Sequence, residues 1–448
     1  MNSKEFLQRN GLNEGDLIEL ETGTGSITGY VAPSANEKIL SLKLPSGYNI
    51  GIEVEEGFTA KKLPGKKEFR KPEAKSAPKI DGLPKISVLH TGGTIASRVD
   101  YRTGTVYNAF APEDLLAMFP ELSRIGNFSS RHLSDMWSDD LRFEHFGVIS
   151  NAVREEAEKG AEGIIIGMGT DNIAVAAAAL SFALEKCPIP VILVGAQRSS
   201  DRGSSDAAMN LICAATFIAK TDFAGVAICM HEGTSDDWCA VLPACKTRKL
   251  HTSRRDAFRP VNSTAIARVN YKTKEISFAK DDYARKSKGE KVSVKPKFEE
   301  KVGLLKITIN MFPEQFEFYS KNGFKGLVIE GTGLGHTPGQ MPDEITKRAH
   351  EKIYPAIGEL AKNCVVVMTS QCLYGRVHMH VYDKGADLVK LGVIPGEDML
   401  PETAFVKLAW LLGNHSPEEA RKLIAENLRG EISPRTEAQA PKPDEMNK

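Results

Sequence analysis

The 448-residue sequence lacks a net charge and a paired-cysteine motif. Lysine and arginine together number 58, as do aspartate and glutamate, so no global electrostatic field draws the chain to nucleic acid or to a membrane surface. The seven cysteines are odd in number and form no Cys-x-x-Cys pair, which argues against a zinc site and a redox couple. We interpret them as reduced thiols within core segments.

Long apolar runs are also missing. The alanine-rich run at residues 173–184 is too short to span a membrane. The N-terminal segment "MNSKEFLQRN" lacks the apolar centre of a signal peptide. Both absences favour a cytoplasmic location for the protein.

The length is sufficient for two or three domains, and the composition changes along the chain. Residues 1–60 contain short β-like runs separated by glycine and proline, a pattern typical of a small strand-rich, barrel-like module. Residues 61–83 include the lysine- and proline-rich stretch "KKLPGKKEFRKPEAKSAPK". We expect this stretch to form a solvated basic linker, although its charge could also contact RNA phosphates or an acidic partner.

From residue 84 onward, apolar runs alternate with helical patterns. The runs "KISVLH", "EGIIIGM", "IPVILVGA" and "AGVAICM" predict an α/β fold with a parallel sheet covered on both faces. We predict a large α/β domain at 84–280, a charged linker at 281–301, a smaller α/β domain at 302–428 and a disordered tail at 429–448. Ligands of such sheets bind at the carboxyl ends of the strands, so the loops after the runs are the functional candidates.

Hydroxyl, carboxylate and amine side chains occur in these loops. "HTGGT" contains Thr94, "GMGTDN" contains Thr170 and Asp171, and "CKTRKLH" offers Lys246 and Lys249. Taken singly, "TDN" is an ordinary helix N-cap, and the basic loop could be a solvated face. Together they could catalyse acyl transfer, because a threonine hydroxyl needs a neighbouring base and a lysine of lowered pKa can serve. The glycines and the helix N-terminus would offer backbone N–H groups to an oxyanion or a carboxylate.

Nucleotide and metal sites are not indicated in this chain. "HTGGTIAS" lacks both the G-K-[S/T] ending of a P-loop and the G-x-G-x-x-G spacing of a dinucleotide site. His90, His251 and His336 are scattered, and no histidine and carboxylate cluster has ligand spacing. We therefore expect no metal and no cofactor in this chain.

"TGGTIAS" and "GMGTDN" resemble the two signature segments of the L-asparaginase and glutaminase family. The resemblance extends over about residues 84–426, because "WSDDLRFEHF", "VGAQRSSDRGSSDAAMNL" and "SQCLYGRVHMHVYDKGADL" also look like family segments in the right order. It implies a two-domain α/β fold. It also implies a catalytic set made of Thr94, Thr170, Asp171 and Lys249, and substrate binding by Ser138, Asp139, Gly93 and Gly169.

The resemblance leaves some assignments open. Lys249 is chosen over Lys246 because "KLH" looks like the family's lysine segment. The counterpart of Thr94 is usually taken as the nucleophile, and which threonine attacks first stays open. Residues 97–110 could form a flap over the substrate, with Tyr101 or Tyr107 as its tyrosine, or an ordinary surface hairpin.

The strand-rich module and basic linker at the front resemble the D subunits of archaeal glutamyl-tRNA(Gln) amidotransferases, a branch of the same family. This resemblance implies hydrolysis of glutamine or asparagine and delivery of ammonia to a tRNA-binding E subunit. That partner would use ATP and Mg²⁺ to convert Glu-tRNA(Gln) into Gln-tRNA(Gln). The resemblance also implies that two copies of this chain form a homodimeric core. A free-standing asparaginase or glutaminase and a non-catalytic amino-acid-binding protein are the alternatives.

Overall fold

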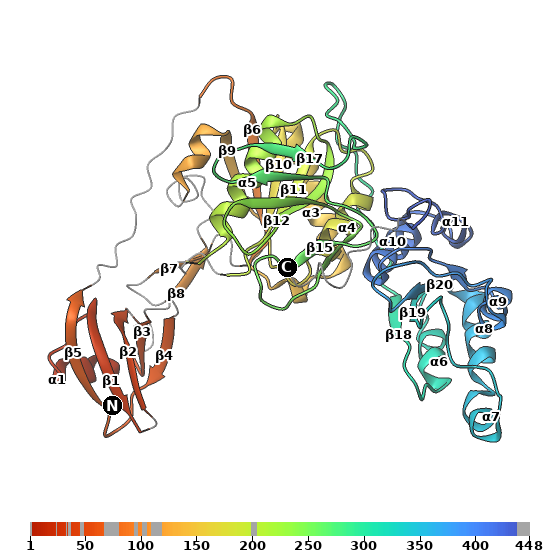
Figure 1. The fold of residues 1–448 in the computed structure, drawn as a ribbon, viewed down its shortest axis with the longest axis horizontal. Coiled ribbons are helices and arrows are strands. Elements are labelled where there is room, and N and C mark those ends of the chain that lie inside the picture. The colour runs from red at the N-terminus through yellow and green to blue at the C-terminus, as the bar shows by residue number, and fades with distance from the viewer. Residues whose placement is uncertain are drawn as a thin grey trace.

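The computed structural model describes residues 2–23, 25–32, 34, 37–44, 49–66, 80–93, 97–100, 105–108, 119–198 and 204–436. These residues form an N-terminal module, a large α/β domain and a smaller α/β domain (Figure 1). The predicted fold class is confirmed.

The N-terminal module is an antiparallel sheet with a core of its own. Its strand order is β4-β3-β2-β1-β5. Alternation along β1 buries Ile18 and Leu20, which pack with Phe6 of α1. The elements of the module are α1 (Ser3–Arg9), β1 (Asp16–Thr22), β2 (Gly25–Ala32), β3 (Ile39–Lys43), β4 (Asn49–Glu53) and β5 (Thr59–Lys66).

Strand β5 corrects the predicted start of the linker at residue 61. Leu63 pairs with Leu17 of β1, and Lys62 lies 2.8 Å from the buried carboxylate of Asp16. A lysine-rich sequence suits this position, because β5 is an edge strand and charged side chains there discourage pairing with other chains. Residues 67–79 of the predicted linker lie outside the described residues.

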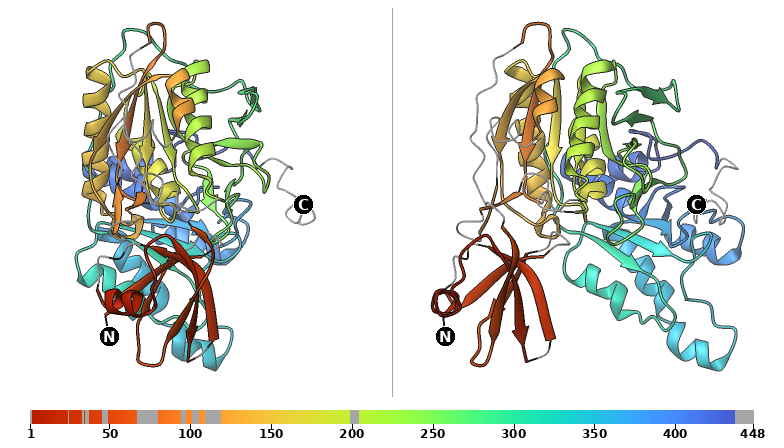
Figure 2. Two further views of the ribbon diagram at one scale, coloured as in Figure 1. Left: turned by 90° about the vertical axis from the view of Figure 1, so that its left-hand side faces the viewer. Right: turned by 60° about the vertical axis from the view of Figure 1, so that its left-hand side comes forward.

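The large domain contains an eight-stranded sheet with the order β17-β16-β13-β12-β11-β10-β6-β9. The run from β12 to β9 is parallel, and its strands β12, β11, β10 and β6 are the four predicted apolar runs. Strands β13, β16 and β17 add an antiparallel edge. Helices α3 and α4 pack on one face and α5 on the other (Figure 2). The strands of this sheet are β6 (Lys85–His90), β9 (Asn127–His132), β10 (Gly163–Gly167), β11 (Pro190–Val194), β12 (Gly225–His231), β13 (Trp238–Pro243), β16 (Ala267–Asn270) and β17 (Ile276–Phe278). The helices and hairpins are α3 (Phe143–Glu158), α4 (Ile173–Ala183), α5 (Ala207–Lys220), η2 (Pro120–Arg124), η3 (Ser138–Asp140), β7 (Ser97–Asp100) with β8 (Thr105–Asn108), and β14 (Thr247–Lys249) with β15 (Phe258–Pro260).

The smaller domain is a parallel sheet with the order β18-β19-β20-β21. Its helix α10 packs on α4, so the two domains share one hydrophobic cluster. The charged segment at 281–301 runs along the large domain, with β-bridges at Arg285 and Ser293. The elements are β18 (Val302–Lys306), β19 (Gly326–Gly331), β20 (Val365–Ser370), β21 (Ile394–Pro395), α6 (Glu314–Lys321), α7 (Glu344–His350), α8 (Ile353–Asn363), α9 (Asp383–Lys390), α10 (Pro401–Asn414) and α11 (Pro417–Leu423).

Residues 429–436 are ordered, which corrects the prediction of a disordered tail from residue 429. Glu431 is completely buried and lies 2.7 Å from the Nζ of Lys407 on α10. Arg429 donates hydrogen bonds to the carbonyl oxygens of Ser181 and Glu185 at the end of α4. The polar composition of this segment was misleading, because its charges have partners inside the protein. Residues 437–448 lie outside the described residues.

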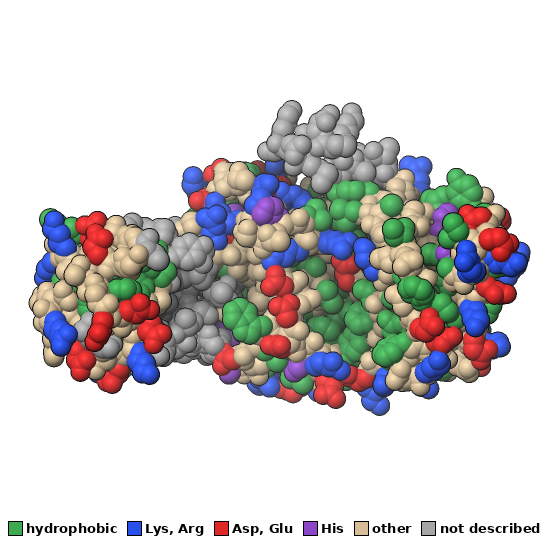
Figure 3. Space-filling model, turned by 90° about the horizontal axis from the view of Figure 1, so that it is seen from below, with side chains coloured by type: hydrophobic (Ala, Val, Ile, Leu, Met, Phe, Trp, Pro, Cys, Tyr) green, Lys and Arg blue, Asp and Glu red, His purple; other side chains and the backbone are tan. Residues whose placement is uncertain are grey.

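Positive and negative side chains are interspersed on the face of the molecule drawn in Figure 3, as a net charge of zero would lead one to expect. In the described part of the chain, no helix is long and apolar enough to cross a membrane.

Candidate active site

Three loops meet at the carboxyl edge of the large sheet because the strands before them end in register. His90 of β6 and Val194 of β11 both pair with Gly167 of β10. The loops that follow these strands carry the sequences "HTGG", "MGTDN" and "GAQ". The carboxyl edge of the sheet, where the sequence predicted the site, therefore brings the loops after β6 and β10 side by side, and these loops contain the two predicted motifs.

Gly92 and Gly93 are required by close contact with the protein's own backbone. Both have positive φ angles, 115° and 80°, which favour glycine. A Cβ atom on Gly92 would lie 2.2 Å from the carbonyl oxygen of Met136, and one on Gly93 would lie 2.5 Å from the amide nitrogen of Gly169. Gly93 and Gly169, two of the predicted substrate-binding residues, are thus neighbours.

Lys249 reaches this edge from a separate hairpin, β14 with β15. Its Nζ lies 3.0 Å from Thr170 Oγ1 and 2.7 Å from Asp171 Oδ1. Phe258 is the hairpin partner of Lys249, and the Nζ of Lys249 lies 6.0 Å from the centre of its ring. Three of the four predicted catalytic residues therefore converge, although 78 residues separate Lys249 from Asp171.

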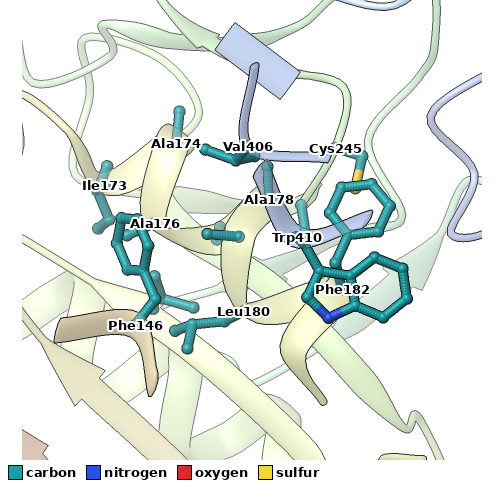
Figure 4. Packing of buried hydrophobic residues seen from close by; sticks show 14 of the residues in the cluster. Phe146, Ile173, Ala174, Ala176, Ala178, Leu180, Phe182, Cys245, Val406 and Trp410 are labelled. Atoms are coloured by element: carbon teal, nitrogen blue, oxygen red, sulfur yellow. The ribbon is translucent and has the colours of Figure 1, made fainter. Parts of the chain in front are cut away.

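Lys246 has a different position in the same hairpin. Its Nζ is 2.7 Å from Asp398 Oδ2 and 3.0 Å from the Asp398 carbonyl oxygen, and the side chains of both residues are buried. Burial lowers the pKa of Lys246, and the charge of Asp398 opposes this shift. The preceding residue, Cys245, packs in the shared cluster beside α10 (Figure 4), and its carbonyl oxygen accepts a hydrogen bond from Thr403. The smaller domain thus holds the base of the hairpin that presents Lys249.

Gln197 is a site residue that the sequence analysis did not assign. Thr170 Oγ1 lies 2.9 Å from Gln197 Oε1, in addition to its contact with Lys249. Gln197 follows β11 in the third loop of the edge, so its place after a strand was the available signal. Its hydrogen bond to the carbonyl oxygen of Arg254, which is 57 residues away, could not be foreseen.

Ser138 and Asp139 lie against the start of α4. Ser138 Oγ accepts a hydrogen bond from the amide of Asn172 at 3.2 Å, and the Asn172 side chain donates to Ser138 O and Asp139 Oδ1. A Cβ atom on Gly169 would lie 3.0 Å from Ser138 Oγ. Ser138 and Asp139 also line a cavity of about 260 Å³, which Phe405 of α10 lines as well. Their proposed role in substrate binding stays a prediction.

Thr94 and Tyr101 lie outside the described residues, and Tyr107 belongs to strand β8. Among the described residues, no group of three or more histidine, cysteine, aspartate or glutamate side chains is arranged to hold a metal ion.

Three family models match the chain. The family "Asparaginase, N-terminal" matches residues 85–283, "Glutaminase/Asparaginase C-terminal domain" matches 301–424, and "GatD N-terminal domain" matches 12–63. The D subunit of the glutamyl-tRNA(Gln) amidotransferase of Thermococcus kodakarensis is 45% identical, with 96% of this chain and 97% of that protein covered. The chain belongs to the family of glutamyl-tRNA(Gln) amidotransferase D subunits.

Further relatives of the D-subunit family show the same extent of similarity. The D subunit of Pyrococcus furiosus is 45% identical over 97% of this chain and 98% of that protein. Among solved structures, the thermostable L-asparaginase from Thermococcus kodakarensis is 31% identical, with a TM-score of 0.67 over 78% of this chain and 99% of that one. L-asparaginase I from Vibrio cholerae is 26% identical, with a TM-score of 0.65 over 79% of this chain and 100% of that one. The asparaginase-like domains and the preceding module are therefore both family features.

Proposed function

We propose that this chain hydrolyses the side-chain amide of glutamine, or of asparagine, and releases ammonia for a tRNA-dependent amidotransferase. The observation that carries the proposal is the contact of the Lys249 amine with both Thr170 and Asp171, at 3.0 Å and 2.7 Å. A hydroxyl, an amine and a carboxylate in mutual contact can activate a threonine for acyl transfer without a cofactor.

In the proposed mechanism, Lys249 acts as the base in its neutral form. It accepts the hydroxyl proton of Thr170, while Asp171 holds the amine in place and stabilises the ammonium that forms. Attack of a threonine oxygen on the amide carbon would form a tetrahedral intermediate, and the Lys249 ammonium would return its proton to the leaving nitrogen so that ammonia departs. Water would then hydrolyse the acyl-enzyme ester that remains. Thr94 is the proposed second threonine, and Ser138, Asp139, Gly93 and Gly169 are the proposed substrate-binding residues.

The proposed partner is the E subunit of the amidotransferase, which would bind Glu-tRNA(Gln) and use ATP and Mg²⁺ to form Gln-tRNA(Gln). The relatives from Thermococcus kodakarensis and Pyrococcus furiosus, both named as D subunits of glutamyl-tRNA(Gln) amidotransferases, support this role. A homodimeric core and a cytoplasmic location complete the proposal.

The test is an ammonia-release assay with purified full-length chain. Glutamine and asparagine are each supplied alone, then with the E subunit, ATP and Glu-tRNA(Gln). We expect the complete mixture to raise glutamine hydrolysis several-fold and to form Gln-tRNA(Gln). Hydrolysis that does not respond to the partner and the charged tRNA would contradict the proposal.

A free-standing asparaginase is the second candidate, because residues of this chain cover 99% of a thermostable L-asparaginase. The same assay separates the two candidates: partner-independent hydrolysis of asparagine favours this one. The Thr170→Ala variant addresses a non-catalytic binding role, since loss of amide hydrolysis in that variant would eliminate such a role.

A further inference from the structure

The side-chain amide of Gln197 has one possible orientation. Its Nε2 lies 3.0 Å from the carbonyl oxygen of Arg254, and its Oε1 lies 2.9 Å from Thr170 Oγ1. A carbonyl oxygen can only accept a hydrogen bond, so the amide nitrogen must face Arg254. The amide oxygen therefore faces Thr170, and the Thr170 hydroxyl is the donor in their hydrogen bond.

A buried carboxylate holds the backbone at Gln197. Asp206, at the start of α5, is completely buried. Its carboxylate accepts hydrogen bonds from the backbone N–H groups of Gln197 at 3.1 Å and Arg198 at 2.9 Å. Asn210 of α5 donates to the same carboxylate and to the carbonyl oxygen of Gly195. The loop that carries Gln197 is therefore tied to a helix of the large domain.

The same loop restricts the side chain of Thr170. A Cβ atom on Gly195 would lie 2.7 Å from Thr170 Cγ2, so the methyl group of the threonine packs directly against this backbone. The hydroxyl is left between Gln197 Oε1 at 2.9 Å and Lys249 Nζ at 3.0 Å. These two groups are thus the neighbours that decide where its hydrogen points.

We propose that Gln197 competes with Lys249 for the hydroxyl proton of Thr170 and thereby restrains the amidase reaction. The inference rests on the proposed function. While Lys249 is an ammonium it donates to Thr170 Oγ1, and Gln197 accepts the hydroxyl hydrogen. When Lys249 is a neutral amine, its lone pair can take that proton, which forms the ammonium and leaves an electron pair on Oγ1. The hydroxyl must break its hydrogen bond to Gln197 before this transfer.

Gln197 is therefore a positioning residue whose removal should accelerate the reaction. One neutral hydrogen bond corresponds to a change of about two- to tenfold in an equilibrium. We expect Gln197→Met, which keeps the length of the side chain without a strong acceptor, to raise kcat for glutamine by about two- to tenfold with KM unchanged. The matched variant Gln197→Glu keeps an oxygen facing Thr170, and its kcat should not exceed that of the wild type. A residue that only supported the fold would lower kcat when replaced.

The experiment measures kcat and KM for ammonia release by the full-length wild type and both variants at one pH, with Tm recorded for each. A Gln197→Met enzyme of wild-type Tm that is no faster than the wild type would overturn the inference, as would an equal rise in Gln197→Glu. If Gln197→Met does not fold, Gln197→Asn, which is too short to reach Thr170, replaces it with the same expected rise. A wild type that releases ammonia from neither glutamine nor asparagine would refute the proposed function, and this inference with it.

Discussion

Two lysines three positions apart in one hairpin have separate tasks at the residue scale. Lys249 contacts Thr170 and Asp171, whereas Lys246 is paired with buried Asp398. We expect Lys249→Met to lower kcat for amide hydrolysis by about a hundredfold or more, with little change in Tm, because Asp171 stays 60% exposed to water.

Lys246→Met is the matched control for this prediction. It would leave the Asp398 carboxylate buried without its cation, which costs about 3–5 kcal/mol of unfolding free energy. Ammonia release and thermal unfolding of both variants check the pair of expectations. Loss of stability in Lys249→Met, together with retained kcat, would show that Lys249 has a structural task instead.

His90 gives stability a dependence on pH. Burial, and to a smaller extent the charge of His132, lower the pKa of His90 from 6.5 to about 4. The unfolded chain therefore binds more protons than the folded one between these two pH values. The contribution of His90 to the free energy of unfolding is fully present above pH 6.5 and is lost as the pH falls to about 4. The loss amounts to about 3 kcal/mol, at 1.36 kcal/mol for each pKa unit.

Urea unfolding of the wild type and of His90→Gln at pH 7 and pH 4 measures this contribution. Subtracting the loss of unfolding free energy measured for the variant from that of the wild type cancels the effect of the carboxylates, which titrate in both proteins. We expect the wild type to lose more unfolding free energy than the variant on acidification. Equal losses would mean that His90 titrates in the folded protein as it does in the unfolded chain.

At the scale of elements, the glycine loop after β6 permits the motifs to meet. Gly93 combines a φ of 80° with a Cβ position 2.5 Å from the Gly169 amide nitrogen, and backbone atoms cannot move aside as a flexible side chain can. We expect Gly93→Ala to lower Tm and to reduce amidase activity, because the loop must separate from the Gly169 loop. Gly233→Ala is the control, since no atom lies within 4 Å of its Cβ position. Equal behaviour of the two variants would contradict this account.

The sequence predicted elements best where an apolar composition coincides with a buried position in the fold. Strands β12, β11, β10 and β6 are continuous apolar runs because both faces of the sheet are covered there. Strand β5 and residues 429–436 were missed because their charged side chains form ion pairs within the fold, as Lys62 does with the buried carboxylate of Asp16. The composition of a segment does not show which of its charged residues are paired in the fold.

The same distinction applies to the site. Thr170 and Asp171 were predicted because ligand sites follow strand ends, and Lys249 was predicted through family resemblance. Gln197 was missed because its contribution depends on the Arg254 carbonyl oxygen, which the fold brings to it from another hairpin. Sequence position could indicate the loop, but the orientation of the amide needed coordinates.

At the scale of the whole molecule, the segment after α11 joins the two domains. Lys407 Nζ is bonded to the carbonyl oxygens of Ile424 and Glu426 and to buried Glu431, while Arg429 reaches the end of α4. Burial lowers the pKa of Lys407, and the charge of Glu431 opposes this. The pair thus fixes the last described residues on α10, the helix that packs against the large domain.

This pair yields a prediction about the stability of the chain. We expect Glu431→Ala to cost about 3–5 kcal/mol, because it leaves the Lys407 ammonium buried without its carboxylate. The double variant Lys407→Met with Glu431→Leu removes both charges and should be more stable than either single variant. Loss of the exposed pair Lys362 and Glu359, whose side chains are 68% and 60% accessible, serves as the control and should cost less than about 1 kcal/mol. Denaturant unfolding of the variants in this cycle measures the coupling energy between Lys407 and Glu431. Additive losses would mean that the two residues are stabilised independently and that their charges do not hold the segment on α10.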